Sequence, residues 1–162
     1  MLHHISTPVK FSNAIEAVCG IQIDDLTLQA TQLRLAGNAA AVDEDYKAAI
    51  SFYTKALQLN PPVGTHLLLS NRSAARLASG DAENALLDAV AAVECAPPEF
   101  TTAGVRHADA LFALKRYDES LMALKEAGRR HPPYMSSQEY TQLENAIRKM
   151  GASSSSSSSA QR

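Results

Sequence analysis

The sequence predicts an all-α protein built from stacked helical hairpins, and three observations lead to this prediction. Prolines that close three successive segments lie 36 and 35 residues apart, and three small residues inside those segments step by the same distances. These landmarks are Pro61, Pro97 and Pro132, and Ala49, Ala85 and Ser120. Between them, apolar and small residues recur every three or four positions, as on one face of a helix. Aromatic residues make up only 6% of the 162 residues and Ala about one in six, which suits thin, closely packed helices and disfavours an all-β fold.

The first repeat contains two predicted helices. The first helix carries a stripe of Leu26, Leu33, Ala36 and Ala40, and the second a stripe of Ala49, Ile50, Tyr53, Ala56 and Leu57. The polar residues 43–45 form the turn, and Pro61 ends the second helix because proline cannot continue one. We expect Ala49 and Ala56 to let the two helices approach closely, with Tyr53 filling the gap between them. Such a hairpin cannot bury its apolar face alone, so it stacks on its neighbours.

The same pattern returns in weaker form in segments 80–97 and 115–132, which gives three repeats over about 30–63, 66–99 and 101–134. These landmarks resemble the tetratricopeptide repeat, a helical hairpin with a period of 34 residues. The resemblance implies a right-handed helical-hairpin solenoid of three tetratricopeptide repeats plus a C-terminal capping helix, over residues 24–150. The later repeats depart from the pattern, since Ala89 and Leu124 stand where the first repeat has an aromatic residue.

The predicted capping helix covers residues 136–150. Its start has the capping-box sequence Ser136-Ser137-Gln138-Glu139, and Gly151 is a typical helix end. The stripe that packs it against the last repeat is Tyr140, Leu143, Ile147 and Met150. Residues 151–162 are a serine-rich tail with little to bury, so we expect disorder there.

At the other end, the sequence does not indicate a role for residues 1–23. A short helix is expected over 12–19. Asp24 or Asp25 is expected to cap the first repeat helix. About seven helices are predicted in total.

Composition narrows the classes of function. The net charge of −2 and the absence of a run of Lys or Arg give no basic field for nucleic acid. No stretch reaches the roughly 18 to 20 apolar residues that a membrane-spanning helix needs. Residues 1–11 do not have the pattern of a secretory signal. Cys19 and Cys95 are too few for a disulfide framework or a zinc site. We therefore expect a cytoplasmic monomer with neither a nucleic acid nor a membrane as its partner.

Catalysis is not predicted either. The five His residues show no metal-ligand spacing, no Ser or Cys has a recognisable nucleophile context, and Gly-rich phosphate loops are absent. The acidic residues 43–45 could suggest a cation site, but in a turn between helices such residues are normally solvated or capping. We expect no enzyme activity, no cofactor and no metal.

Polar residues that suit an anion fall on the predicted first helix of each repeat. Arg34 and Asn38 lie four residues apart on the first of these helices, so they share one face. Asn71 lies on the second, and Thr102 and Arg106, again four residues apart, lie on the third. Arginine presents a planar fork of N–H donors and asparagine amide N–H groups, both of which suit a carboxylate held in one orientation. Stacked side by side, these helices are predicted to form a carboxylate-binding groove.

This set resembles the dicarboxylate clamp of chaperone adaptor tetratricopeptide domains, and residues 70–75, Ser-Asn-Arg-Ser-Ala-Ala, are the most specific piece. The resemblance implies a co-chaperone or adaptor. Its partners would be the Glu-Glu-Val-Asp tails of cytosolic heat-shock chaperones of the seventy- and ninety-kilodalton classes. By position, Arg34 stands for the first basic residue, Asn38 and Asn71 for two asparagines, and Arg106 for the last arginine. Thr102 stands where the family has a lysine.

Two alternatives remain open at this level. An ungapped alignment of the third repeat would put Val105 in place of Arg106, and taken singly Arg34, Arg72 and Arg106 are also consistent with ordinary solvated residues. The second functional class is a general scaffold that binds a helix or an extended internal segment without a free carboxylate. Its groove would be lined by Leu67, Ala74, Leu77 and Ala78.

Overall fold

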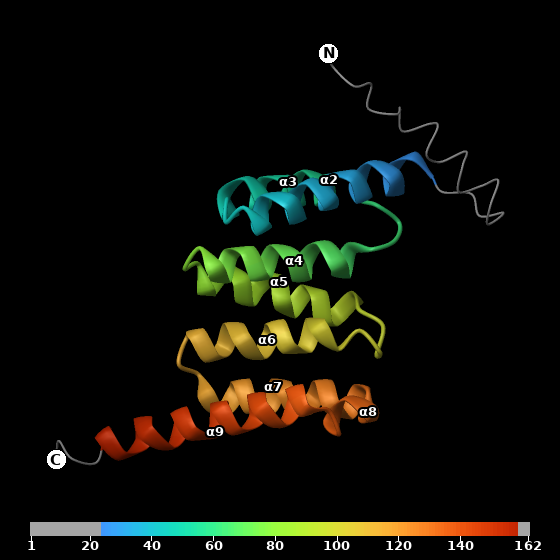
Figure 1. Ribbon diagram of the computed structural model, residues 1–162. Helices are drawn as coiled ribbons and strands as arrows, with labels where there is room; N and C mark the ends of the chain where they lie inside the picture. The colour runs from blue at the N-terminus through green and yellow to red at the C-terminus, as the bar shows by residue number, and fades with distance from the viewer. Residues whose placement is uncertain (1–23, 159–162) are drawn as a thin grey trace.

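The computed structural model describes residues 24–158, and this part of the chain contains eight helices and no strand (Figure 1). The helices are α2 (Asp25–Val42), α3 (Tyr46–Gln58), α4 (Thr65–Ala78), α5 (Ala82–Cys95), α6 (Thr101–Ala113), α7 (Tyr117–Arg130), α8 (Pro132–Met135) and α9 (Gln138–Ser158). The predicted all-α architecture of three stacked hairpins with a C-terminal helix is confirmed. The helix expected over residues 12–19 lies outside the described residues.

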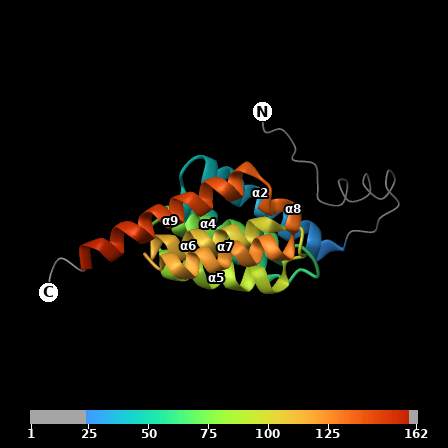
Figure 2. The same cartoon turned by 90° about the horizontal axis from the view of Figure 1, so that it is seen from below.

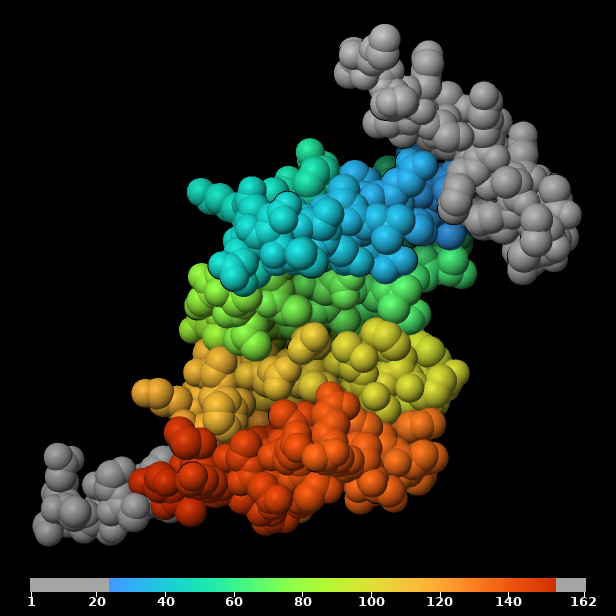
Figure 3. Space-filling model, in the orientation of Figure 1, coloured from blue at the N-terminus to red at the C-terminus, as the bar shows by residue number. Residues whose placement is uncertain are grey.

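The helices pair within each repeat, and the pairs stack in chain order. The most extensive contacts join α2 to α3, α4 to α5 and α6 to α7, and the next join α3 to α4 and α5 to α6. The pairs form successive layers in the space-filling view (Figure 3), and they overlap when seen from below (Figure 2). Contacts also join α4 to α2 and to α6. The first helices of the three repeats therefore lie side by side along one face.

Turns at equivalent positions link the two helices of each hairpin. Glu44, Gly80 and Lys115 adopt positive φ angles of 59°, 89° and 60° and follow the 36- and 35-residue spacing of the other landmarks. The acidic residues beside the first two turns act as caps. Asp45 Oδ1 accepts a 3.0 Å hydrogen bond from Ala48 N, and Asp81 Oδ1 accepts one of 3.2 Å from Asn84 N. Asp24 caps α2 in the same way, as expected, through a 2.8 Å bond from Thr27 N.

Small residues form the contact between paired helices. Ala49, Ala56, Ala85, Ala92 and Ser120 are fully buried, which confirms the predicted small-residue positions. Tyr53 packs among them, opposite Gly37, where a Cβ atom would lie 2.5 Å from the tyrosine ring. Ala89 and Leu124 occupy the equivalent of Tyr53 in the later repeats and are fully buried too. The repeat pattern read from the sequence is therefore the pattern of the core.

We predict that Ala49→Leu and Ala56→Leu each lower the free energy of unfolding by about 1–3 kcal/mol, because neither side chain has room to grow. Urea denaturation measures this change. Ala39→Leu, on the exposed side of α2, is the matched control and should stay within about 0.5 kcal/mol of the parent. Wild-type stability in both core variants would show that the packing face has been misplaced.

Two residues of the predicted stripes are exposed. Leu26 is 45% exposed, because α2 has 18 residues and α3 only 13, so the first turn of α2 runs past the helix that it packs against. Leu28 and Ala30 are buried in α2 instead. Met150 is 42% exposed, because the C-terminal part of α9 projects beyond the stack (Figure 1). Both residues were predicted to be core, and both predictions were wrong.

The C-terminal boundary also differs from the prediction. The expected cap is present, since Ser137 Oγ accepts a 3.1 Å bond from Tyr140 N, and Tyr140 and Ile147 are buried. However, α9 continues through Gly151 to Ser158, past the predicted end at residue 150. Glycine inside a helix is only mildly unfavourable and need not end it. The hydroxyl of Ser153 donates to Lys149 O at 2.9 Å, a local bond that helical serines can form.

The short helix α8 was not predicted. Pro132 and Pro133 were read as the end of the third repeat, but they occupy the first two positions of α8. Proline is favourable there, because the N–H groups at a helix start have no partner within the helix. The two prolines therefore both end α7 and begin α8.

Candidate peptide-binding groove

The exposed face of the first helices is built from three sets of equivalent positions. In each set the residues are separated by 33 positions between α2 and α4 and by 35 between α4 and α6. The sets are Arg34, Leu67 and Thr102; Asn38, Asn71 and Arg106; and Ala41, Ala74 and Asp109. Steps of four and three residues keep the three positions of each helix on one face. Because α4 contacts both α2 and α6, these faces together form one groove.

The structure brings Asn38 and Asn71 together. Asn38 Oδ1 accepts a 2.8 Å hydrogen bond from the hydroxyl of Tyr53 and a 2.9 Å hydrogen bond from Asn71 Nδ2. Both acceptor directions of this oxygen are used, which fixes the orientation of the amide. Among the described residues, the Nδ2 group of Asn38 makes no hydrogen bond, so its two donors remain for a ligand.

One depression is lined by this pair, and a second is lined by Arg34. The larger, of about 320 Å³, is lined by Asn38, Ala41, Tyr46, Tyr53, Asn71, Ala74, Ala75 and Ala78. The smaller, of about 150 Å³, is lined by Thr27, Ala30, Thr31, Arg34, Val63, Gly64, Leu67 and Leu68. Three of the four predicted groove residues, Leu67, Ala74 and Ala78, line these depressions. The fourth, Leu77, is half-buried and lines neither of them.

Arg34 supplies a positive charge to this part of the groove. The guanidinium forms no ion pair with any residue of 24–158. Burial raises the pKa of the Tyr53 hydroxyl, and the positive charge of Arg34 opposes that rise, which places the guanidinium within electrostatic reach of Tyr53. A cation and free amide donors therefore face the same groove.

The third helix is arranged differently. Thr102 is exposed, and Arg106 is half-buried and donates from Nη1 to Asp109 Oδ2 at 3.2 Å. Val105 is buried against the core that includes Leu124, so Arg106 rather than Val105 faces outward. No hydrogen bond or ion pair within 24–158 joins Thr102 or Arg106 to the asparagine pair. The structure thus assembles Asn38 with Asn71, and it places the α6 residues on the same face without direct contact to that pair.

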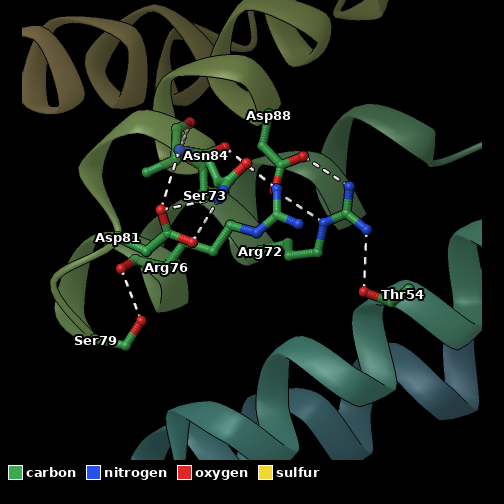
Figure 4. Close-up of polar contacts among 9 residues, drawn as sticks. Thr54, Arg72, Ser73, Arg76, Ser79, Asp81, Asn84 and Asp88 are labelled. Atoms are coloured by element: carbon green, nitrogen blue, oxygen red, sulfur yellow. Dashed lines mark hydrogen bonds and ion pairs between the residues drawn. The ribbon is translucent and has the colours of Figure 1, made fainter.

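A buried ion-pair network beside the groove was missed by the sequence analysis (Figure 4). Arg72 donates from Nε and Nη2 to the two carboxylate oxygens of Asp88, at 2.8 and 2.7 Å, and from Nη1 to Thr54 Oγ1 at 3.0 Å. Arg76 Nη1 donates to Asp88 Oδ2 at 2.7 Å and to Asn84 O at 3.2 Å. Arg72 is therefore a structural residue that ties α4 to α5 and α3, and not the ordinary surface residue that the sequence left possible.

Within residues 24–158 no group of His, Cys, Asp or Glu could hold a metal ion. None of the helices in this range combines the length and the apolar character needed to cross a membrane.

A pocket of about 390 Å³ lies between α5, α6 and α7, on a different face of α6. Its lining includes His107, whose pKa is lowered mainly by burial.

Comparison with known proteins is consistent with this geometry. No protein-family model matches the chain. The protein STIP1 homolog of Dictyostelium discoideum is 38% identical over 92 residues, which is 57% of this chain and 16% of that protein. The small glutamine-rich tetratricopeptide repeat-containing protein 2 of Mycosarcoma maydis is 37% identical over 137 residues, 85% of this chain and 37% of that protein. The chain therefore spans much less than two thirds of the length of either relative.

A solved structure is similar over nearly all of its length. It is the first TPR domain of Spaghetti (RPAP3) bound to an HSP90 peptide of sequence SRMEEVD. Its TM-score is 0.68 and its identity 26%, and the match covers 82% of this chain and 99% of that domain. The protein has the tetratricopeptide-repeat fold. Within this tetratricopeptide-repeat domain, the first and second repeats supply Arg34, Asn38 and Asn71, and the third supplies Arg106 with Asp109 beside it.

Proposed function

We propose that this tetratricopeptide-repeat domain is a protein-interaction module that binds the C-terminal tail of a partner through its free carboxylate. The observation that carries the proposal is the Tyr53–Asn38–Asn71 network, with Arg34 on the same face. Tails of the Glu-Glu-Val-Asp type, from cytosolic heat-shock chaperones of the seventy- and ninety-kilodalton classes, are the proposed ligands. The protein would then act as a cytoplasmic co-chaperone or adaptor and not as an enzyme.

The chemistry supports a carboxylate as the ligand. Bonds from charged or amide N–H donors to a carboxylate are stronger than bonds between neutral groups, and each contributes about 1.5–3 kcal/mol when charge-assisted. Because Tyr53 and Asn71 occupy the oxygen of Asn38, its amide can only donate to a ligand. This arrangement selects an acceptor and rejects a donor.

The similar proteins support the choice of tail. The solved domain with 26% identity over almost its full length is bound to a peptide that ends in Glu-Glu-Val-Asp. The relatives at 38% and 37% identity carry names that place them among STIP1-like and small glutamine-rich tetratricopeptide proteins. A ligand common to such domains fits the donors of this groove.

Calorimetry with a short Glu-Glu-Val-Asp peptide tests the proposal. We expect a Kd on the order of micromolar or weaker, and an affinity that falls as salt is raised. Amidation of the peptide terminus, Arg34→Ala and Asn38→Ala should each weaken binding by about tenfold or more. Arg129→Ala removes the same charge from an exposed site on α7, so this variant is the matched control and should bind like the parent.

A scaffold that binds an internal segment is the second candidate function. The apolar side chains of Leu67, Ala74 and Ala78 along the two depressions favour it. Equal affinity for free and amidated peptides, together with an unchanged affinity in Arg34→Ala, would support this scaffold and reject the carboxylate site.

A further inference from the structure

Asp109 is the one charged residue at the third position of the groove-facing stripes. The equivalent positions on the first two helices hold Ala41 and Ala74, which both line the depression around the asparagine pair. The same spacing of 33 and 35 residues places Asp109 on the groove face of α6, three residues after Arg106. A carboxylate therefore stands where the other two repeats present a methyl group.

The Asp109 carboxylate engages the positive charge of Arg106. Arg106 Nη1 donates to Asp109 Oδ2 at 3.2 Å, and the two side chains are only 35% and 29% exposed. Arg106 Nε is buried and has no acceptor within the described part of the chain. Thr102, one turn before Arg106, adds no charge. The pair of Arg106 and Asp109 is thus close to neutral, whereas Arg34 on α2 keeps its full charge.

The Asp109 carboxylate also lies within electrostatic reach of a buried phenol, that of Tyr134. The hydroxyl of Tyr134, from α8, is buried and makes no hydrogen bond in the described structure. The pKa of this phenol is raised to about 12 by burial and by the negative charges of Glu139 and Asp109. Burial raises the pKa of the Asp109 carboxyl, and the charge and hydrogen bond of Arg106 oppose that rise. Arg106 is therefore the cation paired with Asp109 in the described structure, and a second carboxylate brought to this place would meet repulsion.

We infer that Asp109 determines the ligand specificity of the groove, because it occupies Arg106 and leaves the third repeat unable to bind a second carboxylate. This inference rests on the proposed function and deepens it. The site is a single-carboxylate site at Arg34, Asn38 and Asn71. Tails of the Glu-Glu-Val-Asp type would then bind through the terminal carboxylate alone. A tail whose last residue has an uncharged polar side chain, such as Asn, would bind more tightly, because its amide N–H groups can donate to Asp109.

Two peptides that differ only in the last residue test the inference. One ends in Glu-Glu-Val-Asp and the other in Glu-Glu-Val-Asn, both with a free terminus, and their affinities are measured by calorimetry. For the wild-type protein we expect the Asn peptide to bind more tightly than the Asp peptide. For Asp109→Ala, which installs the residue of the other two repeats, we expect the Asp peptide to gain about tenfold. The Asn peptide loses its hydrogen bond to Asp109 in this variant and should bind more weakly, so the preference reverses.

Controls separate this effect from a change of net charge or of folding. Asp118→Asn removes one negative charge from an exposed site on α7 and should leave the ratio of the two affinities unchanged. Asp109→Asn keeps the shape of the side chain and should reverse the preference as Asp109→Ala does, and helical circular dichroism should match the parent in every variant.

The outcomes distinguish the inference from the proposed function. If both peptides bind only with a free terminus but the wild-type protein does not prefer the Asn peptide, the inference is wrong and the carboxylate site stands. The same conclusion follows if Asp109→Ala shifts both peptides equally. If amidation has no effect on either peptide, the proposed function fails and the inference fails with it.

Discussion

Asp88→Ala is expected to lower the free energy of unfolding by about 3–5 kcal/mol, because it leaves two arginines without their buried counter-ion. Asp88 is 4% exposed and accepts three hydrogen bonds, two from Arg72 and one from Arg76. Urea denaturation measures the loss. Asp118→Ala, an exposed aspartate on α7, is the matched control and should remain within about 0.5 kcal/mol of the parent.

A double-mutant cycle shows whether the loss comes from the network. Arg72→Ala removes the partner that reaches both α5 and Thr54 on α3, so it should also destabilise the protein. Combined with Asp88→Ala, the total should be clearly less than the sum of the single effects, since both changes remove one contact. Strict additivity, or a loss below about 1 kcal/mol for Asp88→Ala, would mean that the ion pair does not hold α4 in place.

The network bears on the groove because Arg72 directly follows Asn71. On α4, Asn71 faces the groove while Arg72 and Ser73 face α5, where the Ser73 hydroxyl donates to Ala85 O at 2.8 Å. Residues 70–75 were the most specific piece of sequence. In the structure Asn71 lies on the groove face, whereas Arg72 and Ser73 contact α5. Because the ion pair joins α4 to α5 one residue after Asn71, we expect it to fix the rotation of α4 and with it the direction of the Asn71 amide.

The sequence predicted the structure best where the same packing constraint recurs in every repeat. Small residues at Ala49, Ala85 and Ser120 must recur because paired helices approach closely in every repeat, so their spacing alone predicted the hairpins. The ends of the array have no repeated neighbour to constrain them. The sequence therefore placed Leu26 and Met150 wrongly in the core and ended the last helix too early, at residue 150. A stripe of apolar residues or a glycine does not reveal how far the packing partner extends.

In the groove, too, the features that follow from the repeat could be predicted and the others could not. The positions of Arg34, Asn38 and Asn71 on one face followed from helical spacing and the repeat period. The pairing of Asp88 with Arg72 and Arg76 did not, because both arginines lie on α4, 16 and 12 residues before Asp88 on α5. Asp109 was within reach of the sequence, since comparison with Ala41 and Ala74 isolates it as the one charged residue of its set.

Tyr53→Ala is expected to destabilise the domain by about 3–5 kcal/mol, the range for removing a buried aromatic side chain. Tyr53 is 2% exposed, and its ring fills the space that Gly37 leaves open. Tyr53→Phe keeps the ring and removes only the hydroxyl that donates to Asn38, so it should cost about 1 kcal/mol in stability. Denaturant unfolding of both variants separates the packing of the ring from the hydrogen bond.

The same residue links the core to the groove, because the Tyr53 hydroxyl holds the Asn38 amide with its nitrogen free for a ligand. Tyr53→Phe should therefore weaken binding of a free-carboxylate peptide by several-fold while the helical content stays unchanged. Gly37→Ala provides the matching test of packing. Alone it places a Cβ 2.5 Å from the ring and should destabilise, but with Tyr53→Ala that space is open and the added helix propensity of about 1 kcal/mol should stabilise. The same sign for Gly37→Ala in both backgrounds would show that the ring does not pack where the structure places it.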